Sequence, residues 1–129
     1  MFTKSYDIDK GHIDFQGVVD GLYYPFYLEW CRHAYMREVV GIDIEEEFTL
    51  HNRLYMVLEY NLKFRKSLKE GDKVDVSCNL VKNEKRTRIN FEQKILVNGE
   101  VYAEAIFVTT CLSNGRPSIP ESIAAFFTE

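Results

Sequence analysis

Apolar residues change their spacing part-way along this chain, and that change is the feature that most constrains its fold. Between Tyr24 and Val40 they recur every three or four residues, which is the period of an amphipathic helix. Between Leu54 and Val97 they alternate with polar residues, which is the period of half-buried strands. The sequence therefore predicts an α+β fold in which one long helix is followed by an antiparallel sheet.

The predicted helix has recognisable start and stop signals. Pro25 suits a first helical position, and Gly41 suits the residue that follows a helix end. One stripe is apolar and strongly aromatic and should be substantially buried: Tyr23, Phe26, Tyr27, Trp30, Ala34 and Tyr35. A second stripe is polar: Glu29, Arg32, His33 and Arg37. Within it, Glu29 can pair with Arg32 or His33 at helical spacing. The acidic run 45–47 should form a solvated loop or a helix end.

A short N-terminal strand and four later strands are expected to make up the sheet. From Leu54 to Phe64 the even-numbered residues are all apolar, which predicts one buried face. The next strand should bury alternate residues: Val74, Val76, Cys78 and Leu80. In the third strand, residues 89–97, Gln93 interrupts the apolar face. Asn98-Gly99 then marks a tight hairpin, because a type I′ turn needs positive φ at both central residues.

The last long strand, residues 101–112, is apolar on both faces, so it should lie at the centre of the sheet or be covered twice. The four later strands are expected to form a meander, each beside the next in sequence. An amphipathic tail at residues 120–127 should close the domain. Because one helix covers only one face of a sheet, the other face or an edge needs a partner, and a homodimer is expected.

Length and charge narrow the function classes. With 129 residues, the chain should fold as one domain, residues 1–129. Its 20 acidic and 16 basic residues give a net charge of −4, which argues against a surface built for nucleic acid. No apolar run approaches the roughly 18 residues of a membrane span, and the N-terminus lacks a signal-peptide core. A cytoplasmic protein with no membrane or nucleic-acid partner is expected.

The cysteines and the spacing of polar residues point away from metal chemistry. Cys31, Cys78 and Cys111 are widely spaced and odd in number, so neither a disulfide framework nor a zinc site is expected. No metal-ligand spacing and no glycine-rich phosphate loop appears. Neither a metal nor a cofactor is therefore expected.

The stretch from His12 to Arg32 places acidic residues and a glycine-rich turn just before the start of the predicted helix. Unpaired N–H groups at a helix start favour developing negative charge. A carboxylate beside them can act as a nucleophile or a general base. Taken alone, an Asp before a glycine turn is more often structural, so this physics by itself makes Asp14 only a weak catalytic candidate.

In spacing, Asp14, Gly17, Tyr24 and Glu29 resemble the signature of the 4-hydroxybenzoyl-CoA-type acyl-CoA thioesterases of the hot-dog fold. The later segments 60–72 and 115–120 are also similar to that family, so the resemblance covers nearly the whole chain. It implies a long helix wrapped by a curved antiparallel sheet, and a dimer with active sites at the subunit interface. It also implies hydrolysis of an acyl-CoA thioester to a free acid and CoA.

The resemblance also implies roles for individual residues. Asp14 falls on the catalytic aspartate, which attacks the thioester carbonyl or activates water. Gly21 falls where a backbone N–H polarises that carbonyl. Tyr24 would line the acyl pocket, although an aromatic residue at helical spacing also suits the core. Lys85 and Arg86 fall on positions that bind the nucleotide phosphates of CoA, with Arg88 close by; a solvated hairpin tip is the alternative.

Two departures from the family pattern and several alternatives stay open. His12 stands where the family often has an Asp, and it either orients the Asp14 carboxylate or caps the strand. Pro25 conflicts with a regular helix beginning at Gly21, so the helix starts later or its first turn is irregular. The acyl group, aromatic or aliphatic, and the choice of dimer or dimer of dimers are undecided. An acyl-carrier-protein thioesterase and a non-catalytic acyl-thioester-binding protein are the alternative functions.

Overall fold

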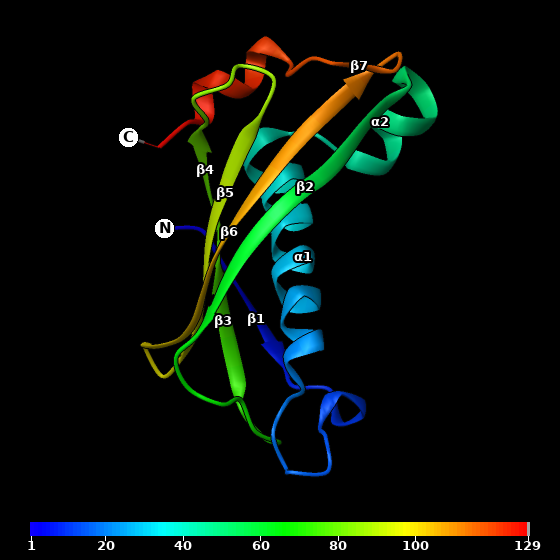
Figure 1. The fold of residues 1–129 in the computed structure, drawn as a ribbon. Coiled ribbons are helices and arrows are strands. Elements are labelled where there is room, and N and C mark those ends of the chain that lie inside the picture. The colour runs from blue at the N-terminus through cyan, green and yellow to red at the C-terminus, as the bar shows by residue number, and fades with distance from the viewer. Residues whose placement is uncertain (129) are drawn as a thin grey trace.

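A curved antiparallel sheet wraps around one long helix in the computed structural model, which describes residues 1–128 (Figure 1). Glu129, the last residue of the predicted domain, lies outside the described residues. The strands are β1 (Thr3–Asp7), β2 (Arg53–Phe64), β3 (Lys73–Ser77), β4 (Asn79–Lys82), β5 (Ile89–Val97), β6 (Glu100–Ser113) and β7 (Arg116–Pro117). The main helices are α1 (Tyr24–Tyr35) and α2 (Ile44–His51). Shorter helical turns are η1 (Lys10–His12), η2 (Gly21–Tyr23), η3 (Met36–Val40) and η4 (Glu121–Phe126).

The sheet order is β1-β3-β5-β6-β2, with β4 paired to β5 and β7 paired to β6. The doubly apolar strand β6 lies between β5 and β2, which confirms its predicted central place. The predicted meander is wrong for β2, which pairs with β6 and not with β3. The reason is that β1 and β5 already occupy the two edges of β3. Strand β2 is therefore left at an edge of the sheet.

A β-bulge divides β2 and overturns the prediction of a single buried face. The pairing register with β6 shifts between Val57 and Glu59. Before the bulge the odd-numbered Tyr55 packs against the core, whereas beyond it the even-numbered Leu62 does so. One extra residue reverses the alternation, so even-numbered side chains face opposite sides on the two halves of the strand.

Helix α1 covers the concave face of the sheet, and the helical region ends where the sequence predicts (Figure 1). Turn η2 precedes α1 and Pro25 lies in the first turn of α1, so the conflict between Pro25 and a helix starting at Gly21 does not arise. Gly41 follows η3 with φ of 82°, as expected of a C-terminal cap. The predicted aromatic stripe is only partly buried, because Phe26 and Trp30 are exposed.

The fully buried side of the helical region includes residues outside the predicted stripe: Leu28, Cys31 and Met36. Helix α2 was not predicted as such. Asp43 caps it by accepting the N–H of Glu46, and the acidic run 45–47 occupies its first turn, where carboxylates suit the helix dipole.

Several local predictions of the sheet region are confirmed. The second predicted strand divides into β3 and β4, yet its four alternate apolar residues are all buried. Asn98 and Gly99 both have positive φ, 50° and 80°, in the hairpin between β5 and β6.

All three cysteines are free and buried. Among the described residues, the helices are too short or too polar to cross a membrane.

Candidate functional site

Asp14 lies in a small hairpin-like loop that joins β1 to α1. Its N–H donates to the carbonyl of Val18 at 2.9 Å, and Gly17 turns the chain with φ of 83°. The Asp14 carboxylate accepts the N–H of Gln16 at 2.8 Å. The side chain is half-buried. One carboxylate oxygen is therefore oriented by its own loop, and carboxylate lone pairs beyond that single bond are available for a reacting group.

Gly21 opens the turn η2 next to this loop. Asp20 caps the turn, because its carboxylate accepts the N–H of Leu22 at 2.9 Å and its carbonyl accepts the N–H of Tyr23 at 2.9 Å. As the first residue of the turn, Gly21 has an N–H that helical geometry leaves without an intrahelical acceptor. A Cβ at this position would lie 3.3 Å from the ring of Phe64. Glycine thus lets the backbone lie close to Phe64 of β2.

Gly21 and Tyr24 are brought together by the structure. They line one hollow of about 380 Å³, with Phe64 and residues 65–67 on its other side. The Tyr24 hydroxyl accepts the N–H of Leu68 at 3.1 Å, and its ring packs edge-on against Phe64. Burial raises the pKa of Tyr24 above its ordinary value. Asp14 is not among the residues that line this hollow.

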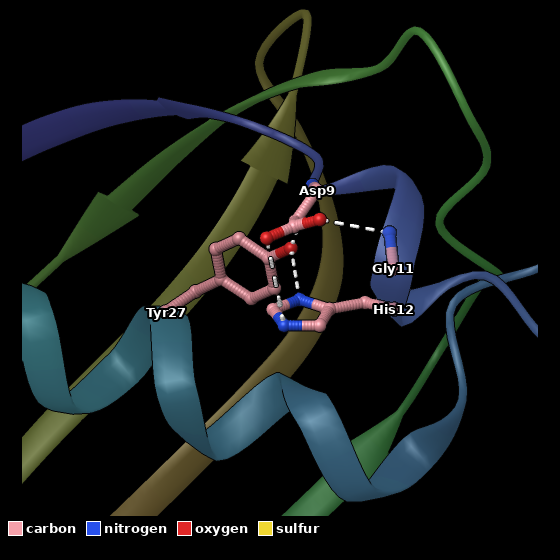
Figure 2. Close-up of polar contacts among 4 residues, drawn as sticks. All are labelled: Asp9, Gly11, His12 and Tyr27. Atoms are coloured by element: carbon pink, nitrogen blue, oxygen red, sulfur yellow. Dashed lines mark hydrogen bonds and ion pairs between the residues drawn. The ribbon is translucent and has the colours of Figure 1, made fainter.

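His12 contacts α1, as Figure 2 shows. Its Nδ1 lies 2.7 Å from the Tyr27 hydroxyl, which also accepts the N–H of Asp9 at 3.1 Å. Its ring stacks on Tyr23 with centroids 4.2 Å apart, and Nε2 lies 4.0 Å from an Asp9 oxygen. The His12 carbonyl accepts the N–H of Asp20. These contacts favour the structural role, because they tie the loop that carries Asp14 to the helix.

The basic residues lie at the other end of the molecule. The loop between β4 and β5 carries Lys85, Arg86 and Arg88, and Figure 1 shows it beside η4, at the end of the helical region opposite to the Asp14 loop. Lys85 and Arg86 are exposed and Arg88 is half-buried. Arg86 and Arg88 share a hollow of about 410 Å³ with the C-terminal segment. Within one copy of the chain, the basic residues therefore do not meet Asp14.

Comparison with known proteins decides the family. The family model of the thioesterase-like superfamily matches residues 7–127. The chain belongs to this superfamily. The search of curated proteins finds no match.

Solved structures share the fold of this thioesterase-like chain. A thioesterase from Thermus thermophilus, complexed with coenzyme A and Zn, is 26% identical with a TM-score of 0.82, covering 97% of this chain and 90% of that one. A gentisyl-coenzyme A thioesterase is 18% identical with a TM-score of 0.87, covering 98% and 100%. A DHNA-CoA thioesterase from Staphylococcus aureus is 18% identical with a TM-score of 0.80, covering 96% and 82%. The hot-dog fold of the thioesterases, with its long helix and curved sheet, is confirmed.

One polar cluster in the thioesterase-like chain escaped the sequence analysis. The sequence places Arg32 on the polar stripe of the helix; in the structure it is buried and its Nη1 donates to Oε1 of Gln93 at 3.2 Å. Gln93 in turn donates to the carbonyls of Leu28 at 2.9 Å and Ser77 at 3.3 Å. Gln93 interrupts the apolar face of β5, and this interruption indicates a buried polar contact. The sequence does not identify the partner, because Arg32 lies 61 residues away from Gln93.

The predicted pair of Glu29 and His33 forms on the surface of α1. Oε1 of Glu29 lies 3.8 Å from Nε2 of His33. Burial lowers the pKa of His33, although Glu29 opposes the shift, so the imidazole is neutral near pH 7 and the pair is weak. Within residues 1–128, no three His, Cys, Asp or Glu side chains gather as a metal site.

Proposed function

We propose that the protein is an acyl-CoA thioesterase that releases a free acid and CoA, with Asp14 as its essential carboxylate. The observation that carries the proposal is local. A half-buried carboxylate, oriented by the Gln16 N–H, lies in the loop that leads directly to η2, which begins at Gly21. Membership of the thioesterase-like superfamily supports the reaction class.

The chemistry asks two things of the protein. Asp14 either takes a proton from the water that attacks the thioester carbon, or attacks that carbon itself to form an anhydride that water then cleaves. In both routes the carbon–sulfur bond breaks and CoA leaves as a thiolate that takes up a proton. The Gly21 N–H donates to the carbonyl oxygen as negative charge builds there, an interaction worth about 3 kcal/mol.

A homodimer completes the proposed site. The free edge of β2 carries apolar side chains that are exposed: Leu54 (40%), Met56 (42%) and Leu58 (47%). A long apolar edge strand is a template for pairing with another strand. Two-fold antiparallel pairing of β2 with a second copy brings the Arg53 end of one strand beside the Phe64 end of the other. Elements that lie at opposite ends of one copy then become neighbours across the interface.

The basic loop binds the nucleotide end of CoA in this proposal. Arg86 and Arg88 supply guanidinium groups for phosphate beside an apolar wall that includes Ile119 and Phe127, and Lys85 adds a further cation. Within one copy this loop is remote from Asp14, so the dimer is what allows both to serve one substrate. The Thermus thermophilus neighbour, solved with coenzyme A, favours CoA over an acyl carrier protein.

The test is thiol release from a panel of aliphatic and aromatic acyl-CoAs by wild type, Asp14→Asn and the control Asp7→Asn. Asp7 is an exposed acid at the end of β1, so its variant makes the same charge change away from the site. We expect Asp14→Asn to lose at least about a hundredfold in kcat while staying folded, and Asp7→Asn to match wild type. Equal activity of Asp14→Asn and wild type would reject Asp14. If wild type cleaves no acyl-CoA, acyl carrier proteins are the next substrates, and stable binding without cleavage identifies a non-catalytic protein.

A further inference from the structure

A second cavity, of about 290 Å³, opens between the C-terminal half of α1, α2 and the first half of β2. It is separate from the hollow beside Gly21. Its walls are partly apolar, formed by residues such as Met36, Val57 and Phe91. Its polar lining is what sets it apart, because Arg32 and Thr109 both belong to it.

Arg32 brings a positive charge to this cavity. The residue is 6% exposed. Its guanidinium lies 4.0 Å above the Phe107 ring and makes one hydrogen bond, to the neutral amide of Gln93. Among the described residues, no carboxylate lies within 4.0 Å of it. A guanidinium carries five N–H donors, and a buried arginine is normally paired.

One hydroxyl of a cavity-wall residue is also unsatisfied. The Thr109 Oγ1 is buried just beneath the cavity surface and, within the described part of the chain, has no hydrogen-bond partner. By contrast, the next residue, Thr110, donates to the carbonyl of Thr87 at 2.7 Å. Buried polar atoms are nearly always bonded, so an orphaned one near the Arg32 guanidinium requires an explanation.

We infer that this cavity receives a carboxylate at the far end of the acyl chain, so that the preferred substrates are half-thioesters of dicarboxylic acids. The inference rests on the proposed thioesterase function. A carboxylate neutralises the single charge of Arg32 and accepts hydrogen bonds from its free N–H groups. Rotation of the Thr109 side chain about χ1 brings its unbonded hydroxyl to the same carboxylate as a further donor. The apolar walls take the intervening methylenes.

Charge at the cavity limits the choice of anion. Glu29 also lines it, and its carboxylate is half exposed and directed to His33 rather than to the guanidinium. A doubly charged phosphate would meet one cation and this nearby carboxylate, whereas a carboxylate brings only one charge. In the β2-paired dimer, this half of one copy lies next to the Gly21 end of the other. The cavity is then placed to hold the tail of an acyl group whose thioester lies at Asp14 of the second copy.

The first test compares kcat/KM for chains of equal length, glutaryl-CoA with pentanoyl-CoA and adipyl-CoA with hexanoyl-CoA. We expect wild type to prefer the carboxylate-bearing member by at least about thirtyfold. Thr109→Val keeps the side-chain shape and removes only an unbonded hydroxyl, so it should fold, and the preference should fall by about tenfold. Arg32→Met should abolish the preference. Thr110→Val is the matched control and should keep the wild-type ratio.

The second test measures binding without catalysis, by NMR titration of each protein with glutarate and with pentanoate. We expect glutarate to shift signals of the cavity residues in wild type and Thr110→Val, and not in Arg32→Met. Hydrolysis with equal kcat/KM for both members of each pair overturns this inference and leaves the proposed function standing. Glutarate binding that depends on Arg32 in a protein that cleaves no thioester supports the anion site and rejects the thioesterase. Absence of both the preference and the binding overturns the inference.

Discussion

At the scale of single residues, burial controls the ionisation of the Cys31 thiol. Cys31 is fully buried, and its thiol donates to the carbonyl of Val76 at 3.2 Å. Burial raises the pKa of the Cys31 thiol from 9.0 to about 12. Because the folded state disfavours the thiolate, the stability from this thiol is fully present below pH 9 and is lost as the pH rises toward 12.

We therefore expect the difference in free energy of unfolding between wild type and Cys31→Ala to narrow above pH 9. The free energy of unfolding, measured in urea with a reductant from pH 7.5 to 10.5, should show a constant gap below pH 9. Above it, the gap should close by up to about 1.4 kcal/mol per pH unit, the effect of one proton. Val76→Ala removes buried atoms but no titrating group, so its free energy of unfolding should change with pH in parallel with that of wild type. If the free energy of Cys31→Ala also runs parallel to that of wild type, the Cys31 thiol does not ionise on unfolding.

Residue-scale prediction worked best where the chemistry is local. The spacing of Asp14 and Gly21 singles them out because loop, turn and helix start lie within a few residues of one another. Their catalytic roles stay predictions. Arg32 could not be placed in the same way, since its burial depends on Gln93 in a strand 61 residues further on. The sequence pattern of a helix reports which residues are polar, and tertiary contacts decide which of them leave the solvent.

At the scale of elements, the end of the helical region depends on one backbone conformation. Gly41 has φ of 82°, and a Cβ there would meet no atom within 4 Å. Gly41→Ala therefore changes backbone strain without a clash, and we expect a loss of about 1 kcal/mol and about 4 °C in Tm. Gly41→Asn should lose less, because asparagine tolerates the left-handed region. Thermal unfolding followed by circular dichroism measures both, and equal losses would show that the strain argument is wrong.

Element boundaries were predictable wherever a residue imposes its own conformation. Pro25, Gly41 and the Asn98-Gly99 turn all lie where their backbone preferences suggest. The bulge in β2 was not predictable, because the apolar alternation continues unbroken through Leu58 while the pairing register changes. Strand periodicity alone cannot reveal an extra residue, since the bulge is set by how β2 fits against β6.

At the scale of the whole molecule, the exposed edge of β2 and the separation of Asp14 from the basic loop have one common explanation. The sequence predicted a partner for the sheet because one helix cannot cover both faces. It did not predict which edge, since that depends on β1 occupying the edge of β3 that a meander would give to β2. With β2 at the margin, the apolar side chains before its bulge face solvent unless a second copy covers them.

Such a dimer predicts that two defective variants restore each other. If each site takes Asp14 from one copy and Arg86 from the other, Asp14→Asn and Arg86→Glu are each impaired as homodimers. Random exchange in an equal mixture makes half of the dimers mixed, and each mixed dimer has one intact site of two, so about one quarter of wild-type activity should return. Thiol release before and after subunit exchange measures this. Leu58→Lys, placed at the free edge in both parents, should give monomers in sedimentation and prevent the recovery. If both parent variants are dimers, exchange their subunits and still regain no activity, then Asp14 of one copy and Arg86 of the other do not act in the same site.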